Sequence, residues 1–176
     1  MDEPIQSERV YDGRLFQVDL VDVPRGADGI RQYEIVRHPG AVVVVPVRDD
    51  GSILLIRNDR VAVGERLLEF PAGKLEPGEA PVAAAGRELE EETGYRAAEV
   101  DPIGTFYTSP GFASERMHAF VARGLQHVGQ RLEPGEMIEV QAVSRAAMLE
   151  LLDGGEIRDG KTLAAALLWL RSTERS

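Results

Sequence analysis

Apolar and polar residues alternate along much of the first two thirds of the chain, which is the pattern of half-buried β-strands. Between Arg14 and Val23, for example, Leu15 and Val18 stand among polar neighbours. The β-branched run from Ala41 to Val47 instead predicts a strand that is buried on both faces. The expected strands are Arg14 to Val23, Ile30 to Val36, Ala41 to Val47, Ser52 to Arg57, Leu67 to Phe70, Thr105 to Thr108, Met117 to Val121 and Ile138 to Val143.

Helical patterns appear in three segments. The strongest runs from Ala80 to Thr93, where Pro81 suits a first turn and Gly94 suits the position that ends a helix. Arg145 to Leu152 and the amphipathic segment from Thr162 to Arg171 are the other two. We therefore expect an α+β fold, an α/β/α sandwich with a mixed β-sheet over residues 38–176. An antiparallel β layer is expected over residues 1–37.

Composition and charge narrow the possible functions. The 176 residues contain no cysteine, which excludes disulfides, thiolate zinc sites, iron–sulfur clusters and a cysteine nucleophile. The net charge of −10 repels phosphate backbones and anionic lipids, so neither nucleic acid nor membrane is an expected partner. The first residues carry no signal-peptide pattern, and no apolar run is long enough to cross a bilayer. We expect a cytoplasmic protein.

Three carboxylates share one face of the helix predicted from Ala80 to Thr93. Glu88, Glu91 and Glu92 stand at positions i, i+3 and i+4, a spacing at which like charges repel and weaken a helix. A bound divalent cation would offset this repulsion, because Mg²⁺ prefers oxygen ligands. The alternative is a solvated acidic face, the usual fate of such a charge run.

The surrounding residues follow a longer pattern, G-x5-E-x7-R-E-U-x-E-E-x-G-U, where U is bulky and apolar. Chance agreement at residue frequencies near 6% is on the order of 1 in 10⁸ per window. The matching residues are Gly73, Glu79, Arg87, Glu88, Leu89, Glu91, Glu92 and Gly94. This segment resembles the Nudix box, with Tyr95 in place of the usual final aliphatic residue. The resemblance extends over about residues 38–172.

The resemblance implies a Nudix fold and the hydrolysis of a nucleoside diphosphate linked to another moiety, with Mg²⁺ or Mn²⁺ as cofactor. It assigns the metal to Glu88 and Glu92, with Glu91 and the carbonyl of Ala72 as further ligands. Glu91 is also a candidate for catalysis. Arg87 is expected to act in the site by pairing with a glutamate of the box, such as Glu79.

Residues outside the box resemble the ADP-ribose pyrophosphatase subfamily of Nudix hydrolases. Leu68 to Gly73 matches its E-(L/F)-P-A-G lead-in, and Pro110 follows Gly94 by the 16 residues typical of the subfamily. The resemblance implies that substrate is bound by Arg60, Glu34, Glu69, Ser109, Pro110, Gly111 and Glu115. It also implies a homodimer whose N-terminal strands are exchanged between subunits.

The resemblance also implies a catalytic base in an acidic loop before a late strand, here the segment from Glu133 to Glu139. Glu136 best matches the family position, while Glu133 and Glu139 are alternatives, and each of them could instead belong to a solvated turn. The leading interpretation is hydrolysis of ADP-ribose to AMP and ribose 5-phosphate. Asn58 and Asp59 depart from the subfamily pattern, so another nucleotide sugar such as GDP-mannose stays open. A nucleotide-binding sensor without catalysis is the alternative from another class.

Overall fold

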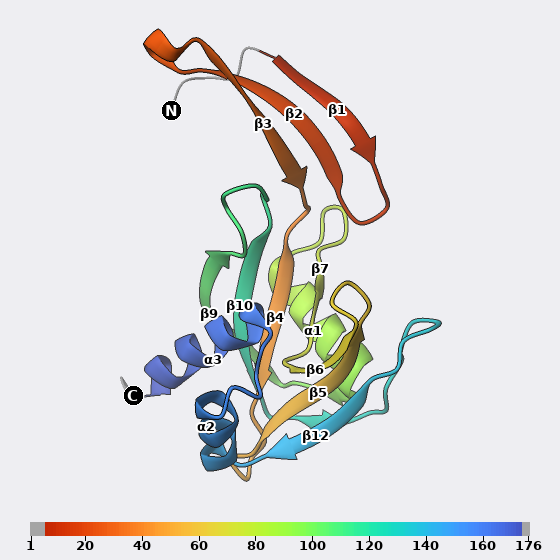
Figure 1. Cartoon of the computed structure of the whole chain (residues 1–176). Helices are drawn as coiled ribbons and strands as arrows, with labels where there is room; N and C mark the ends of the chain where they lie inside the picture. Colours follow the sequence, from red (N-terminus) through yellow and green to blue (C-terminus); the bar gives the residue numbers. More distant parts are fainter. Residues whose placement is uncertain (1–5, 174–176) are drawn as a thin grey trace. The chain divides into compact units, whose positions relative to one another are not determined.

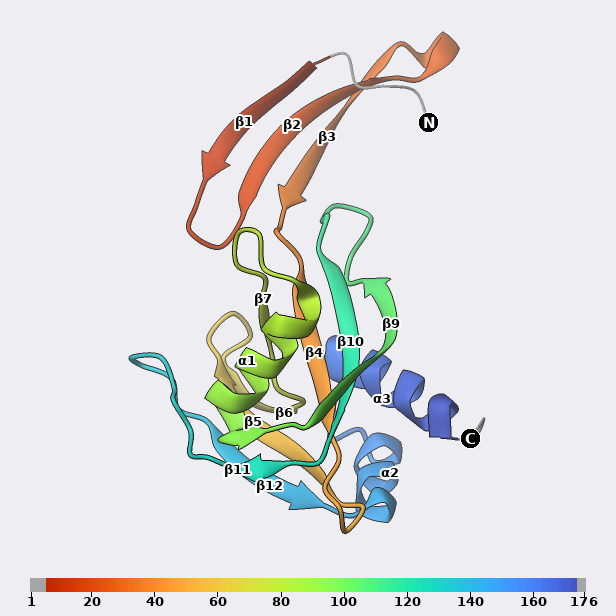
Figure 2. The same cartoon turned by 180° about the vertical axis from the view of Figure 1, so that it is seen from behind.

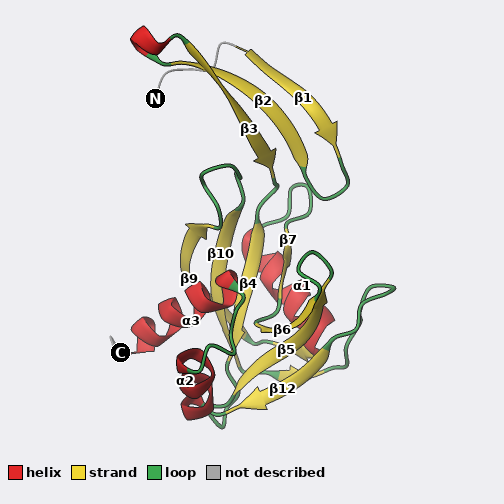
Figure 3. Cartoon of the chain, viewed as in Figure 1, coloured by secondary structure: helices red, strands yellow, loops and turns green. Residues whose placement is uncertain are grey.

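The computed structural model describes residues 6–173 and divides the chain into two units, which we consider separately. The first unit comprises the chain up to Gly40 together with Phe106–Arg116, and the second comprises Ala41–Thr105 and the chain from Met117 onward. The elements are labelled in Figure 1 and coloured by type in Figure 3: β1 Gln6–Asp12, β2 Gln17–Pro24, η1 Gly26–Asp28, β3 Ile30–Arg37, β4 Ala41–Pro46, β5 Ile53–Arg60, β6 Glu65–Glu69, β7 Ala72–Lys74, α1 Pro81–Thr93, β8 Tyr95–Arg96, β9 Glu99–Tyr107, β10 Arg116–Arg123, β11 Gln126–His127, β12 Glu139–Val143, α2 Arg145–Asp153 and α3 Gly160–Thr173.

The first unit is built on an antiparallel sheet in the order β1-β2-β3. Asp19, in the central strand, is 6% exposed and accepts hydrogen bonds from Arg9 Nε at 2.8 Å and Arg37 Nε at 2.9 Å, one from each neighbouring strand. The predicted pair of strands, β2 and β3, is confirmed. Strand β1 was not predicted, because its residues are all exposed and show no apolar alternation.

The second unit contains a mixed sheet in the order β7-β4-β10-β9 and an antiparallel sheet in the order β12-β5-β6. Strands β4 and β10 are parallel, with Ala41 opposite Met117 and Pro46 opposite Ala122. Helix α1 packs against β4 and β7, and α3 packs against β4. Figures 1 and 2 show these two helices on opposite faces of the mixed sheet. The expected α/β/α layering is confirmed.

Strand β4 forms the centre of this unit. All six of its residues are buried, as its β-branched run predicts. Val42 and Val44 pack with Ala84, Ala85 and Leu89 of α1 in one core cluster. Because side chains alternate along a strand, the remaining valines of β4 face the opposite side of the sheet.

The predicted helices are confirmed with small shifts at their ends. Helix α1 begins at Pro81 and is ended by Gly94, whose φ of 75° lies in the left-handed region. Helix α3 begins at Gly160, two residues before its predicted start. Strand β9 begins at Glu99 rather than at Thr105, since Pro102 within the run weakens the sequence signal for a strand. Within residues 6–173 no helix combines the length and the apolar character that a bilayer crossing requires.

Candidate active site

Helix α1 carries three glutamates toward the short strand β7. Leu89 and the alanines of α1 are buried against β4, which fixes the rotation of the helix about its axis. Glu92 is 5% exposed, and its Oε2 accepts the backbone N–H of Ala72 at 2.8 Å. The side chain of Glu88 is 13% exposed and that of Glu91 33%. Glu92 and Glu88 are therefore largely buried, while Glu91 lies at the edge of the group and keeps contact with water.

Arg87 connects these glutamates to the loop before the helix. Its Nε and Nη2 donate to the two carboxylate oxygens of Glu79 at 2.9 and 3.0 Å, which is the predicted pairing. Its Nη1 donates to Glu88 at 2.7 Å and to Glu91 at 3.1 Å. A further bond, from Nη2 to the carbonyl of Lys74 at 3.3 Å, ties the guanidinium to the loop backbone. Arg87 thereby neutralises part of the local negative charge and holds the loop against the helix.

Gly73 leaves room for the carboxylate of Glu88. A Cβ built on Gly73 would lie 2.0 Å from the Cδ and Oε1 of Glu88, far inside van der Waals contact. The backbone of Gly73 is not among the positive-φ glycines, so the requirement is for space rather than for conformation.

Burial makes the ionised form of Glu92 costly. Burial, together with the negative charges of Glu88 and Glu136, raises the pKa of Glu92 to about 8. The N–H of Ala72 and the charge of Arg60 oppose this rise in pKa only in part.

The pKa of Glu88 is also raised, first by burial and then by the charges of Glu91 and Glu136, while Arg87 opposes the rise. Glu136, the predicted base, is thus close enough to both Glu88 and Glu92 to act on them electrostatically. This clustering of negative charge is the arrangement that a divalent cation would stabilise.

The donor set fits a hard metal ion such as Mg²⁺, because it consists only of carboxylate and carbonyl oxygens. In the part of the chain that the structure describes, no three acidic, histidine or cysteine side chains already form a metal cage. Glu88 and Glu91 are instead bonded to Arg87. Each of these bonds uses one oxygen of its carboxylate, so the other oxygen could bind a metal ion while Arg87 stays in place.

Glu69 and Arg60 form a second charged group beside Phe70. Arg60 Nε and Nη2 donate to the two oxygens of Glu69 at 2.7 and 2.6 Å, and Lys161 also pairs with Glu69. Glu69 is fully buried, whereas the side chain of Arg60 is 37% exposed. The exposed part of Arg60 can therefore contact a ligand directly, whereas Glu69 can influence a ligand only through Arg60 and Lys161.

Lys161 and its neighbour Asp159 were not identified from the sequence as part of this group. Lys161 Nζ lies 2.9 Å from Asp159 Oδ1, and the side chains of both are about 15% exposed. The sequence did carry a signal for Asp159. An aspartate directly before the first helical residue, Gly160, and three residues before Thr162, is a typical helix N-cap.

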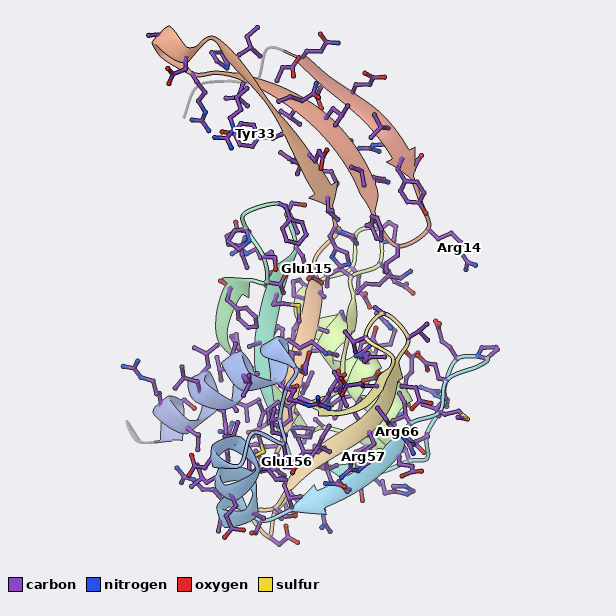
Figure 4. All side chains as sticks on the ribbon, viewed as in Figure 1. Arg14, Tyr33, Arg57, Arg66, Glu115 and Glu156 are labelled. Atoms are coloured by element: carbon purple, nitrogen blue, oxygen red, sulfur yellow. The ribbon has the colours of Figure 1, made fainter. Side chains whose placement is uncertain are left out.

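The loop between β11 and β12 carries the predicted base. Glu136 Oε2 accepts the N–H of Glu133 at 2.8 Å, and the N–H of Glu136 donates to the carbonyl of Glu133 at 3.1 Å. Gly135, with a φ of 95°, closes this turn. Glu139 lies instead at the start of β12, where its carboxylate pairs with Arg66 Nη2 at 3.1 Å, and Figure 4 labels Arg66 on β6. Glu136 and Glu133 are thus on the turn, and Glu139 is on the strand.

The remaining predicted substrate residues belong to the first unit. Ser109 opens the turn that contains Pro110 and Gly111, and its carbonyl accepts the N–H of Phe112 at 3.1 Å. Glu115, labelled in Figure 4 on the segment between β9 and β10, accepts the hydroxyl of Thr108 at 2.7 Å.

Glu34, the last of these substrate residues, is exposed on β3, opposite Leu20 of β2. Within the first unit its carboxylate therefore stays open to solvent.

Comparison with known proteins gives a consistent set of matches. The model of the NUDIX domain matches residues 36–167. An ADP-ribose pyrophosphatase of Bacillus subtilis (strain 168) is 41% identical over 177 residues, covering 98% of this chain and 94% of that protein. A methanol dehydrogenase activator of Bacillus methanolicus is 38% identical and covers 93% and 90% of the two chains. A crystal structure of an ADP compounds hydrolase superposes with a TM-score of 0.85 at 28% identity, covering 99% of this chain and 96% of that one.

Proposed function

The chain belongs to the Nudix family, and on that premise we propose that it hydrolyses the diphosphate of ADP-ribose to AMP and ribose 5-phosphate with Mg²⁺ or Mn²⁺. The observation that carries the proposal is the group of Glu88, Glu91 and Glu92 beside Ala72, in which two largely buried carboxyl groups with raised pKa values would be stabilised in their ionised form by a divalent cation. The similarity to an ADP-ribose pyrophosphatase along nearly the whole chain supports this choice of substrate.

The metal would be held by Glu88, Glu91, Glu92 and the carbonyl oxygen of Ala72. When bound, it supplies positive charge against the diphosphate and helps to activate the attacking water. Arg87, bonded to Glu88 and Glu91, keeps these two carboxylates together in the absence of metal. It also holds Glu79 and the loop that leads into the helix.

Glu136 is proposed as the general base that takes the proton of the attacking water. Its turn is short and contains Gly135, and its charge already acts on Glu88 and Glu92. Glu133 stays an alternative, since it lies on the same turn. Glu139 is the weaker candidate, because its carboxylate is paired with Arg66.

Arg60 is proposed to contact the substrate, either at a phosphate or by stacking on the base. Glu69 supports this role by fixing the guanidinium through two short hydrogen bonds. In the first unit, Glu34, Glu115 and the Ser109–Gly111 turn remain proposed substrate contacts.

A homodimer is proposed as the functional assembly. The first unit exposes several large apolar side chains, including Tyr11 at 53%, Leu15 at 56% and Ile30 at 61%. Apolar surface of this kind favours association with a second copy of the chain.

Two alternative functions are compatible with the site. Asn58 and Asp59, which precede Arg60, differ from the pattern of the ADP-ribose pyrophosphatases, so another nucleotide sugar, such as GDP-mannose, is an alternative substrate. The Bacillus methanolicus relative, named as an activator of a dehydrogenase, favours a regulatory role as the second candidate. A purified chain that cleaves a nucleotide sugar with no other protein present would favour hydrolysis.

The test is to incubate the purified protein with Mg²⁺ or Mn²⁺ and a panel of ADP-ribose, GDP-mannose and UDP-glucose, with the products separated by chromatography. We expect AMP from ADP-ribose at the highest kcat/KM. Glu88→Gln should abolish this activity. Glu90→Gln is the matched control, because Glu90 lies on the same helix but pairs with Arg96 and Arg131 instead. Preference for GDP-mannose would move the proposal to that substrate.

A further inference from the structure

The first turn of α3 contacts the segment Glu69–Ala72, although the two lie about 92 residues apart in the chain. Lys161 pairs with the buried carboxylate of Glu69. Thr162 Oγ1 accepts the backbone N–H of Phe70 at 3.0 Å. Neither residue belongs to the Nudix motif, and neither contacts the predicted metal ligands directly.

The hydroxyl of Thr162 has a fixed orientation. It donates to Asp159 Oδ2 at 2.6 Å, and the same oxygen accepts the backbone N–H of Thr162 at 2.9 Å. Because a hydroxyl has only one proton, its lone pairs are left for the N–H of Phe70. Thr162 and Phe70 are both fully buried, so water does not replace this bond when the hydroxyl is removed.

Each residue of the segment has a separate partner. Glu69 is held by Arg60 and Lys161, and Phe70 by Thr162. The carbonyl of Pro71 accepts the N–H of Val44 at 2.9 Å. The N–H of Ala72 donates to Glu92 at 2.8 Å. A shift of Phe70 would therefore be transmitted through one residue to the backbone that faces Glu92.

We propose that Thr162 is a positioning residue for the metal site. By holding the N–H of Phe70, it sets the place of the Ala72 peptide relative to Glu92, so that α3 supports the metal ligands from outside the Nudix box. The inference rests on the proposed metal-dependent function, since it concerns the ligands named there. Outer partners of metal ligands commonly change metal affinity by about 10- to 100-fold when they are removed.

A purely structural role for Thr162 would predict something different. In that case its loss would loosen the packing of α3 on β4 and lower the melting temperature. Any change in metal affinity would then be no larger than in other variants with the same loss of stability. The decisive measurement is therefore metal binding without substrate, compared among variants of similar stability.

The experiment titrates Mn²⁺ into the substrate-free full chain and follows free Mn²⁺ by electron paramagnetic resonance. Thr162→Val keeps the shape of the side chain but removes the acceptor, and we expect a Kd for Mn²⁺ that is about ten-fold weaker. Thr162→Ser keeps the hydroxyl and should restore a Kd close to that of the native chain. Ser144→Ala is the matched control, because Ser144 caps α2 by accepting the N–H of Ala147 and does not touch the segment. It should lower the melting temperature and leave the Kd unchanged.

An unchanged Kd in a folded Thr162→Val variant would overturn the inference, as would an equal weakening in Ser144→Ala. If Thr162→Val does not fold, Thr162→Ala takes its place, because it also removes the acceptor of the Phe70 N–H. Its Kd should weaken in the same direction, and an unchanged Kd would again overturn the inference. A native chain that binds no Mn²⁺ refutes the metal dependence in the proposed function itself, which separates the two failures.

Discussion

Replacing Glu92 by glutamine should stabilise the metal-free protein while removing most of its activity. Glu92 is 5% exposed, and burial raises its pKa to about 8 in the folded state. Glutamine keeps a carbonyl oxygen that can accept the N–H of Ala72, but it cannot ionise. The substitution thus removes a desolvation cost and a metal ligand together.

The magnitude follows from the two pKa values. In the unfolded chain the carboxyl has a pKa near the reference value of 4.5, whereas in the folded protein it is about 8. Each pKa unit corresponds to about 1.4 kcal/mol. Between pH 4.5 and pH 7 the free energy of unfolding of the native protein should therefore fall by about 3 kcal/mol relative to that of the Glu92→Gln variant. The direction follows from the raised pKa. Below the pKa of the unfolded chain the carboxyl is protonated in both states and the native protein loses no stability, whereas above the pKa of the folded state the loss of stability is greatest. The stability gap should therefore open as the pH rises from 4.5 and level off above about 8.

The assay is thermal unfolding in EDTA at several pH values between 5 and 8. For a domain of this size, about 3 kcal/mol corresponds to a melting temperature roughly 6–12 °C higher for the variant at pH 7. Saturating Mg²⁺ should reverse the order, because a ligand that binds only the folded native chain stabilises it. Glu91→Gln is the matched control, since the side chain of Glu91 is 33% exposed and keeps contact with water.

A Glu92→Gln variant that melts below the native chain in EDTA at pH 8 would refute the reasoning. A gap that stays constant across the pH range would do so too, since it would show that the benefit does not come from an ionisable group. Full activity in the variant would remove Glu92 from the metal site.

Three further predictions concern the same site. Gly73→Ala should displace the Glu88 carboxylate, which lies 2.0 Å from the added Cβ, and calorimetry should then give roughly ten-fold weaker Mn²⁺ binding at little cost in melting temperature. Glu136→Gln should lower kcat by roughly 10²–10⁴-fold and change KM little. A larger fall in kcat for Glu133→Gln or Glu139→Gln would transfer the role of base to that residue. EDTA should abolish turnover and added Mg²⁺ should restore it, so turnover that persists in excess EDTA would contradict metal dependence.

The sequence predicted best those features that depend on neighbouring residues. The limits of α1 follow from Pro81 and Gly94, two local signals, and the structure confirms them within one residue. The pairing of Arg87 with Glu79 was also foreseen, because both residues belong to one short motif. Burial of β4 followed from its own composition.

Features that depend on distant residues could not be predicted in the same way. The sequence interpretation assigned Glu69 to substrate binding and did not foresee that its side chain is fully buried. A carboxylate can be buried only when partners compensate its charge, and one partner, Lys161, is 92 residues away. The same holds for Thr162, whose bond to Phe70 depends on the packing of α3 rather than on local sequence.

The first unit is built from two stretches of chain, and this has a consequence for how the gene can be cut. The N–H of Val36 donates to the carbonyl of Phe112 at 2.8 Å, and the carbonyl of Val36 accepts the N–H of Ser114 at 2.9 Å. The N–H of His38 donates to Ser114 Oγ at 3.1 Å. A fragment that begins at Ala41 would leave residues 106–116 without these partners. The N-terminal sheet is therefore not a detachable module: recombination or truncation that removes or exchanges it must also rewrite the segment between β9 and β10.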